Sequence, residues 1–243
     1  MNYLYIIIVM TKLITIILSY YNQNDFLKYH LNIWNEYPEH IRDKFTFFIM
    51  DDCSKENAND VLKNIDLKNL DLHIYRSKKD IYCNISGVRN LGAQQCQTDW
   101  LVLLDMDTII NLDLAESLLK LAFETNNNTT FKFNRKVIND SDHPKNNKVH
   151  PAVCLIRKKD YWDVGGCEED LVGHYGWTDP SFWHKARGKV KVEECKKIYL
   201  IYHSDGEADI KRDHGHNRKV FKDKMRTNSW SKDYIRFKWE KIK

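Results

Sequence analysis

The sequence predicts a single α/β domain: an open, mostly parallel β-sheet with helices on both faces. Apolar segments typical of strands alternate with segments whose apolar residues recur at helical spacing. The strongest strand segments are continuous apolar runs, which is typical of strands covered on both faces. The 243 residues, of which 42% are hydrophobic, can bury one substantial core, and no repeat, proline-rich linker or shift of composition divides the chain.

The first half of the chain alternates strands and helices. A β-branched run at 13–18 predicts the first strand, and residues 25–34 predict the first helix, with Asn24 or Asp25 as its N-cap. Further elements are expected in order: a strand at 45–50, a weak helix at 57–65, a short strand at 72–75, a helix at 86–95 and a strand at 100–104. This order is the signature of parallel strands joined by helical crossovers.

The second half is less regular. Its expected elements are a helix at 114–123, a strand within a mobile loop at 126–147, a strand at 152–157, a glycine-rich loop, a helix at 180–187 and a last strand at 198–202. Pro180 suits the first position of its helix, and Asp179 is then the expected N-cap.

Charge and cysteine usage bound the partners and the compartment. The net charge is +4, and from Lys211 onward about twelve cations face about four acids. We expect this tail to be a solvated face; peripheral attraction to an anionic membrane or a polyanionic substrate is the alternative. No nucleic-acid binding is expected, because the tail aromatics at 230–239 have roughly helical spacing and suit packing. Six scattered cysteines favour a reducing, cytoplasmic setting.

The start of the chain is ambiguous. Residues 1–10 are almost wholly apolar, but Lys12 ends the run before the roughly 20 residues of a membrane-spanning helix. A basic n-region and a small-residue cleavage site, the marks of a signal peptide, are both missing. Met1 and Met10 therefore both stand as candidate start residues.

Polar residues follow three predicted strands at the point where each ends: 19–22, 51–52 and 105–107. In open α/β sheets, ligands bind beyond the carboxyl ends of the strands, so these residues are expected to line one crevice. Asp105 and Asp107 can present two carboxylates to one hard cation, Mn²⁺ or Mg²⁺, while Met106 points into the core. Aspartates at strand ends also cap helices, so the pair alone is weak support.

Four segments of the chain together resemble the successive motifs of glycosyltransferase family 2, which has the GT-A fold. They are Ile17-Leu18-Ser19-Tyr20-Tyr21-Asn22, Phe48-Ile49-Met50-Asp51-Asp52-Cys53-Ser54, Arg89-Asn90-Leu91-Gly92-Ala93 and Trp100 to Asp107. The stretch from Gly165 to Pro180 is similar to the galactosyltransferase-type segment that follows in this family. The resemblance covers about residues 11–221 and implies that residues 1–243 form one GT-A domain, with a basic tail at about 211–243.

The resemblance implies a metal-dependent transfer from a nucleotide-sugar, with a UDP-sugar expected as the donor. Tyr20 and Asp52 would contact the base and ribose, with Asp51 beside them. Arg89 would reach the diphosphate or brace the acids of the metal site. Asp105 and Met106 complete the expected donor-binding residues. Outside the family pattern, Asp51 and Asp52 would be an ordinary turn and Arg89 a solvated helix residue.

The resemblance also assigns the chemistry on the acceptor, a glycan or glycoconjugate. Asp179 would take the proton from the acceptor hydroxyl in a single displacement with inversion. Trp177 and Thr178 would contact the acceptor, although Trp177 could equally close the core. The family usually carries Glu at the position of Thr178, which puts acceptor recognition in doubt. Glu169 and Asp170 are reserve candidates for the base.

His203, at the end of the last strand, matches the third metal ligand of the family, with His214 and His216 as competitors. The run around those two histidines could instead form a lid. Two other functions stay open. A nucleotidyltransferase would carry a basic, glycine-rich loop after the first strand, which this chain lacks. A non-catalytic nucleotide- or sugar-binding protein would bind the donor without turnover.

Overall fold

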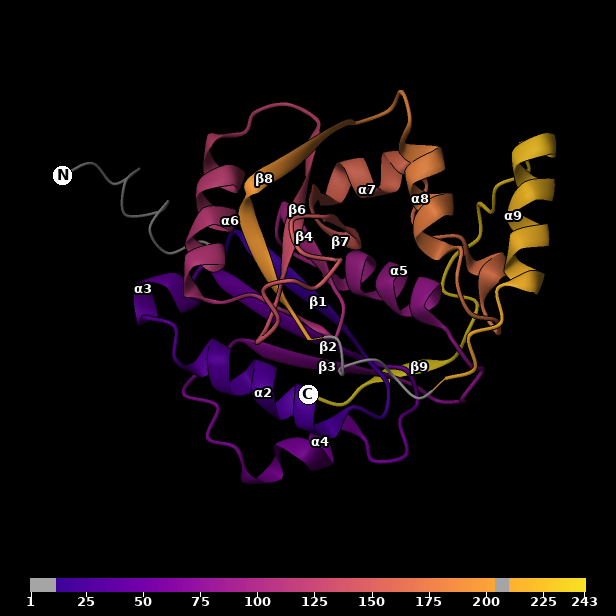
Figure 1. Ribbon diagram of the computed structural model, residues 1–243. Coiled ribbons are helices and arrows are strands. Elements are labelled where there is room, and N and C mark those ends of the chain that lie inside the picture. Colours follow the sequence, from indigo (N-terminus) through magenta and orange to yellow (C-terminus); the bar gives the residue numbers. More distant parts are fainter. Residues whose placement is uncertain (1–11, 204–209) are drawn as a thin grey trace.

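The computed structural model describes residues 12–203 and 210–243, so the choice between Met1 and Met10 lies outside the described residues. These residues form a nine-stranded sheet in the order β5-β8-β6-β7-β4-β1-β2-β3-β9, covered by helices on both faces (Figure 1). The open α/β sheet predicted from the sequence is confirmed. Its strands are parallel in the centre and mixed toward the edges.

Four neighbouring strands run parallel: β1 (Ile14–Tyr20), β2 (Phe45–Asp51), β3 (Leu72–Ser77) and β4 (Trp100–Leu104). The chain builds outward from β1 through β2 to β3 and then returns to place β4 on the other side of β1. The order of strands therefore reverses between β1 and β4. Beyond the carboxyl ends of strands at such a reversal, the flanking loops diverge and leave a crevice.

Antiparallel pairings extend the sheet on both sides. β7 (Val149–Arg157) pairs with β4 and with β6 (Thr129–Val137). The long β8 (Lys191–Tyr202) runs parallel to β6 and meets the two-residue β5 (Thr108–Ile109) only at its end. The rest of β8 lies at the edge of the sheet beyond β6, and most of its side chains are exposed, several of them charged. This composition discourages pairing with another chain.

One face of the sheet is covered by α2 (Asn24–Asn35), α3 (Glu39–Arg42), α4 (Ala58–Val61) with the 3-10 turn Leu62–Asn64, and α6 (Leu112–Glu124). Its core contains Trp34 stacked on Phe47, at a ring-centroid distance of 4.6 Å. The sequence placed the N-cap of α2 at Asn24 or Asp25, which is wrong. Gln23 holds that position without a side-chain hydrogen bond.

The other face is covered by α5 (Ile85–Gln95), α7 (Lys158–Val164) and α8 (Thr178–Ala186), with the 3-10 turn Glu169–Leu171 between the last two. Gly92 lets α5 approach β1, because a Cβ there would lie 2.6 Å from Ile17 Cγ2. The short α7 was not predicted from the sequence. This helix ends at Val164, and its C-cap residue, Gly165, has a positive φ of 93°, which suits glycine.

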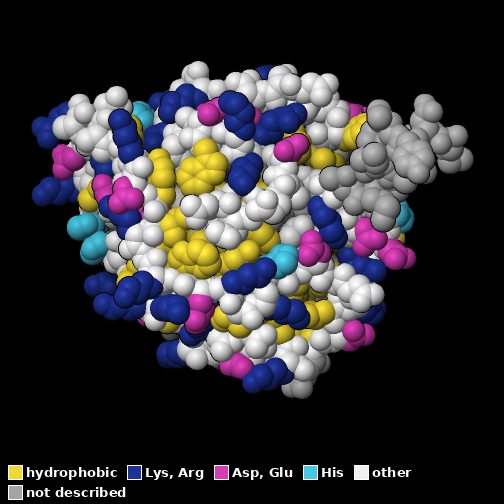
Figure 2. All heavy atoms as spheres, turned by 180° about the vertical axis from the view of Figure 1, so that it is seen from behind, with side chains coloured by type: hydrophobic (Ala, Val, Ile, Leu, Met, Phe, Trp, Pro, Cys, Tyr) yellow, Lys and Arg dark blue, Asp and Glu magenta, His cyan; other side chains and the backbone are white. Residues whose placement is uncertain are grey.

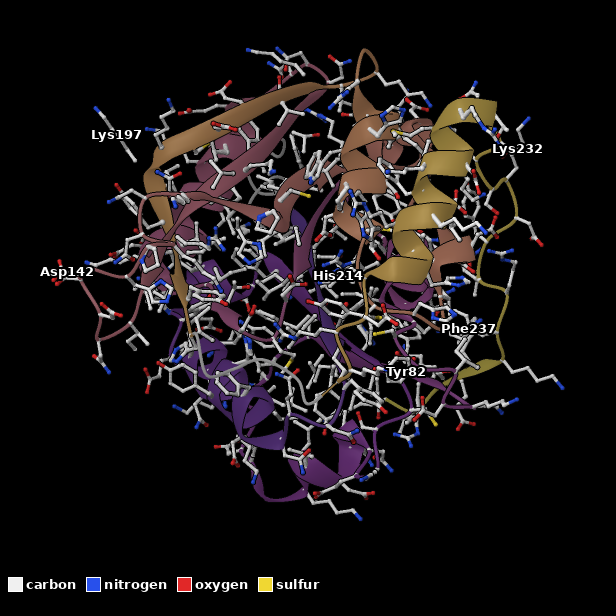
Figure 3. All side chains as sticks on the ribbon, turned by 45° about the vertical axis from the view of Figure 1, so that its right-hand side comes forward. Tyr82, Asp142, Lys197, His214, Lys232 and Phe237 are labelled. Carbon is white, nitrogen blue, oxygen red and sulfur yellow. The ribbon has the colours of Figure 1, made fainter. Side chains whose placement is uncertain are left out.

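After α9 (Gly215–Thr227), the chain forms an extended strap, residues 228–238, that leads into β9 (Trp239–Lys241) at the edge beside β3. Figure 3 labels Lys232 and Phe237 on the strap as it passes α9 toward β9. Glu169 holds the strap by accepting hydrogen bonds from Ile235 N (2.6 Å) and Arg236 N (3.0 Å). The aromatic side chains of the strap and of β9 pack against the rest of the protein, as predicted. They lie on an extended segment, however, and not on a helix.

On the face of the molecule in Figure 2, charged side chains are dispersed among backbone and uncharged polar groups, and apolar side chains are visible in patches toward the middle. In the described part of the chain, no helix combines the length and apolar character that a membrane span requires.

Candidate active site

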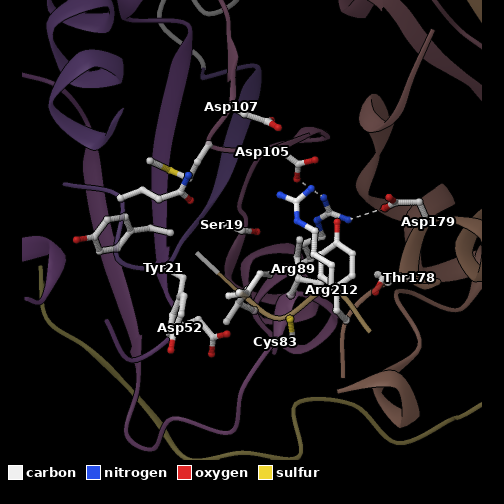
Figure 4. Close-up of a pocket in the computed structure, with 18 of the residues that line it drawn as sticks. Ser19, Tyr21, Asp52, Cys83, Arg89, Asp105, Asp107, Thr178, Asp179 and Arg212 are labelled. Atoms are coloured by element: carbon white, nitrogen blue, oxygen red, sulfur yellow. Dashed lines mark hydrogen bonds and ion pairs between the residues drawn. The ribbon is translucent and has the colours of Figure 1, made fainter. Parts of the chain in front are cut away.

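A pocket opens where the sheet reverses, beyond the carboxyl ends of β1, β2 and β4 (Figure 4). One wall comes from the residues that follow these strands, and the opposite wall comes from α5, the loop before α8 and the start of α8. The residues that line the pocket include Tyr20, Tyr21, Asp52, Arg89, Asp105, Met106, Asp107, His174, Tyr175, Trp177, Thr178, Asp179 and Arg212.

Arg89 of α5 connects the two walls of the pocket. Its side chain is 2% exposed, and its guanidinium donates to Asp105 Oδ1 at 2.5 Å and to Asp179 Oδ1 at 3.1 Å. Burial alone would lower the pKa of Arg89, but the two carboxylates raise it above the usual value, so the cation is retained. A single buried charge thus fixes the two aspartates that the sequence places 74 residues apart.

Asp105 and Asp107 converge through a turn, and not through the extended backbone that the sequence analysis assumed. The carbonyl of Asp105 accepts from Thr108 N (3.1 Å) and Thr108 Oγ1 (2.9 Å), which closes the turn. One ligand atom from each of Asp105, Asp107 and His150 lies within 4.8 Å of the others. Two carboxylates at this spacing suit a hard divalent cation.

His150 of β7 was not predicted, and its hydrogen bonds limit what it can do. Nδ1 lies 3.2 Å from Ala152 N and 3.1 Å from Val153 N, so it accepts from these backbone groups. Burial lowers the pKa of His150 to about 3, and the neutral ring therefore carries its proton on Nε2. In this tautomer Nε2 donates a hydrogen bond, and ligation through Nε2 would need the proton to leave.

The predicted third ligand, His203, lies next to the aspartates through its backbone: His203 N donates to Asp107 O at 2.8 Å. Its ring contacts Phe26 and Tyr29 of α2 edge-on, at centroid distances of 5.5 and 5.3 Å. The role of His203 stays a prediction. Its two competitors pack on residues that line the pocket: His214 lies against Tyr175, and His216 stacks on His174.

The Asp-Met-Asp turn is supported from below by His30 of α2. His30 is fully buried, and its Nε2 lies 3.0 Å from the carbonyl oxygen of Met106. Burial lowers the pKa of His30 to about 4, so the ring is neutral near pH 7 and donates this hydrogen bond. Met106 itself is buried in the core, as predicted.

The two acids at the end of β2 have different surroundings. Asp51 is fully buried and accepts from Ser54 N and Ala58 N, and it pairs with Arg76. It is turned away from the pocket and organises the loop after β2. Asp52 lines the pocket, accepts from Asn84 N at 2.9 Å, and has a pKa raised by burial to about 6.

Neighbouring tyrosines divide in the same way at the end of β1. Tyr20 borders the pocket but is fully buried in the core, and its hydroxyl contacts Asn24 Oδ1 and Glu56 O. Tyr21 is partly exposed at the pocket, and its hydroxyl donates to Asp80 at 2.9 Å. The ring available to a ligand is therefore that of Tyr21, which the sequence analysis did not single out. Alternation of side chains along a strand could have raised this alternative.

The start of α8 brings the predicted acceptor-side residues to the pocket. The helix begins at Thr178 after Trp177, which has a positive φ of 66°, so the expected N-cap role of Asp179 is wrong. The carboxylate of Asp179 instead faces Arg89 (Figure 4). Trp177 packs one face on Phe221 of α9, at 5.1 Å between centroids, and still lines the pocket.

The reserve candidates for the base lie outside the pocket. Glu169 is buried beneath the strap, and Asp170 pairs with Lys224 and Arg236. The pocket also contains Tyr175 and Arg212, whose guanidinium lies 5.5 Å from the Tyr175 ring centroid. No local sequence signal distinguishes Arg212 from the other cations of the tail.

Comparison with known proteins agrees with this geometry. The model of the glycosyl transferase family 2 matches residues 15–173 of the chain. No curated protein sequence matches it. Among solved structures, the chain is similar to residues 1–349 of TarS from S. aureus in complex with UDP, with 16% identity and a TM-score of 0.64 over 90% of this chain and 72% of that one.

Two other similar structures carry different ligands. The mannosyltransferase PcManGT from Pyrobaculum calidifontis, in complex with GDP-Man and Mn²⁺, is 15% identical with a TM-score of 0.60, over 86% of this chain and 60% of that one. The catalytic domain of Drosophila beta1,4-galactosyltransferase 7, in complex with xylobiose, is 11% identical with a TM-score of 0.55, over 87% and 79%. The chain spans 60% of TarS 1–349 in a further structure.

Proposed function

Because the chain belongs to glycosyltransferase family 2 and has the fold of these structures, we propose that it transfers a sugar from a UDP-sugar to a hydroxyl of a glycan or glycoconjugate, with inversion and with Mn²⁺ or Mg²⁺. The observation that carries the proposal is the bridge from Arg89 to Asp105 and Asp179. It sets a candidate metal carboxylate and a candidate base at opposite sides of one pocket.

The donor side is formed by Tyr21, Asp52 and the Asp-Met-Asp turn. The carboxylate of Asp52 can accept hydrogen bonds from the N–H or O–H groups of a nucleoside. The carboxylates of Asp105 and Asp107 would hold the cation, which on binding would neutralise charge on the departing diphosphate. UDP and GDP-Man, the nucleotides bound in two of the similar structures, support a nucleotide-sugar as the donor.

On the acceptor side, Asp179 would remove the proton. One of its oxygens accepts from Arg89, which leaves the other oxygen to accept from an acceptor hydroxyl. The acceptor oxygen then forms the bond to the anomeric carbon while the bond from that carbon to the phosphate oxygen breaks. The products are the glycosylated acceptor, the nucleoside diphosphate and a proton on Asp179. A single displacement of this kind inverts the configuration.

Calorimetric titration of UDP with and without Mn²⁺ tests the donor side. We expect binding that needs the cation in the natural chain and in Asp142→Asn, a control in an exposed loop. Asp107→Asn should lose the cation-dependent part. UDP binding that depends on neither the cation nor Asp107 would contradict the proposed metal site.

Turnover separates the enzyme from a non-catalytic binding protein. Asp179→Asn should bind UDP as the natural chain does but lose at least about 100-fold in hydrolysis or transfer of the donor sugar. A natural chain that binds the nucleotide-sugar without any turnover would support the non-catalytic alternative. Peripheral contact of the tail with an anionic membrane is a further proposal, supported by the exposed cations of α9: Arg218, Lys219, Lys222 and Arg226.

A further inference from the structure

A half-buried lysine on β6, Lys132, forms no ion pair with any residue in the described part of the chain. The ammonium of Lys132 lies 4.5 Å from the ring centroid of Trp183. Glu194 stands opposite Lys132 on β8, yet within the described residues Lys132 forms no ion pair at 4.0 Å or less. Burial lowers the pKa of Lys132. The attraction of a cation to an aromatic ring recovers only part of the free energy lost when the ammonium leaves water.

Trp183 places this lysine near the candidate base. It follows Asp179 by four residues in α8, so the two side chains lie one turn apart on the same face of the helix. The indole Nε1 donates to Pro151 O at 2.6 Å, which fixes the ring against β7. Asp179 and Glu194 both attract the Lys132 ammonium electrostatically, and Arg135 repels it. Lys132, Trp183 and Asp179 therefore form one cluster between α8 and the β6–β7 strands, which we call the acceptor-side cluster.

Only Asp179 is shared between this cluster and the donor pocket. Lys132 and Trp183 do not line that pocket, whereas Asp179 does. A molecule that contacts the cluster can thus reach Asp179 without occupying the place of the nucleotide. Trp183 is partly exposed, and aromatic rings offer an apolar surface to the C–H groups of a sugar.

The charges around Asp179 would disfavour an anionic acceptor if Lys132 were neutral. Asp52, Asp105, Asp107 and Asp179 bring four carboxylates to the pocket. The guanidinium groups there are that of Arg212 and that of the buried Arg89, which two of the carboxylates already share. The ammonium of Lys132, which is in no ion pair among the residues that the structure describes, supplies the attraction that a negatively charged acceptor needs. Charge complementarity of this kind selects partners as much as it strengthens binding.

We propose that the acceptor-side cluster binds an acceptor sugar that carries a carboxylate or phosphate group. The ammonium of Lys132 pairs with that group, Trp183 packs against the sugar, and Asp179 receives the proton of the attacking hydroxyl. This inference rests on the proposed function for the role of Asp179. It adds the chemical class of the acceptor and assigns Lys132 as the residue that selects it.

Matched probes test the charge preference directly. Binding to the full chain loaded with UDP and Mn²⁺ is measured by saturation-transfer NMR for methyl β-glucuronide against methyl β-glucoside, and for glucose 6-phosphate against glucose. We expect the anionic member of at least one pair to bind at least about tenfold more tightly, as a charge-assisted hydrogen bond provides. The pair that shows the preference tells a carboxylate from a phosphate.

Variants then assign the preference to one residue. Lys132→Gln should abolish it, Lys132→Arg should retain it, and Lys120→Gln, an exposed lysine on the opposite face of the sheet, should leave it unchanged. UDP affinity should be the same in all three variants. Equal binding within both pairs, no binding of either anionic probe, or a preference that survives in Lys132→Gln would overturn the inference.

The same experiment distinguishes this inference from the proposed function. If UDP fails to bind to the natural chain, the proposed function falls first. If UDP binds and the donor sugar is turned over, but the charge preference fails, the proposed function stands and only the anionic acceptor is excluded.

Discussion

Replacing Arg89 with Met removes the cation that joins the two walls of the pocket while keeping an unbranched, helix-compatible side chain. In the natural chain the guanidinium satisfies one oxygen of Asp105 and one of Asp179. In the variant both carboxylates remain, about a quarter exposed, with the shared cation gone.

The expected cost follows from these two contacts. A hydrogen bond to a charged group contributes about 1.5–3 kcal/mol, and removing one partner of a buried ion pair costs about 3–5 kcal/mol. Because both carboxylates retain some solvent, we expect the lower end, about 3 kcal/mol. For a chain of this size the corresponding fall in melting temperature is about 6–12 °C.

Calorimetry on four proteins measures this cost and its origin: the natural chain, Arg89→Met, Asp179→Asn and the double variant. In the natural chain, Asp179→Asn should be neutral or destabilising, because it weakens the bond to Arg89. In the Arg89→Met chain it should be stabilising, because it removes one of two carboxylates left without the cation. Arg157→Met, which removes a cation 4.4 Å from the Trp100 ring centroid, is the control.

Two results would refute this reasoning. The first is a melting temperature for Arg89→Met within about 2 °C of the natural chain, which would mean that the bridge contributes little. The second is the same sign for the effect of Asp179→Asn in both backgrounds, which would mean that the two aspartates do not interact through Arg89.

Three further predictions concern the surroundings of the site. UDP affinity should fall as pH drops through about 6, where Asp52 gains a proton, and Asp52→Asn should remove this dependence in calorimetric titrations. His30→Leu should weaken Mn²⁺ binding about tenfold, measured by electron paramagnetic resonance, because Met106 O loses its donor; unchanged affinity would deny His30 a positioning role. Glu169→Gln should speed amide hydrogen exchange at 230–241 at least about tenfold, and equal rates would contradict the anchoring of the strap.

The strands of the first half of the chain could be predicted to within two residues, because each is a continuous apolar run that ends in polar residues. β4 begins and ends where the sequence placed it, β2 extends one residue further, to Asp51, and β1 begins one residue later and ends two residues later, at Tyr20. The helix α5, which comes before β4 in the chain, was also predicted, since the spacing of its apolar residues is regular. The short α7 was not predicted, because seven residues show too little periodicity.

The side-chain arrangement of the site could be predicted only in part. The pocket at the ends of β1, β2 and β4 follows from the order of elements, so Asp52, Asp105 and Asp107 could be placed there. The side chains of neighbouring residues such as Asp51 and Asp52 point in different directions, and no local sequence pattern reveals which of the two faces the pocket. The pairing of Arg89 with Asp179 and the position of His150 depend on contacts between distant segments, which one sequence does not specify.

The pairing of β9 with β3 bears on how this protein is made. Tyr75 and Lys241 are partners in the sheet although about two-thirds of the chain separates them. During synthesis, β3 therefore emerges long before the strand that covers its edge, and its backbone groups stay open to other nascent chains for that time. Contacts of such high sequence separation also slow folding. Yield in expression should consequently depend on chaperones that shield this edge until β9 has been synthesised.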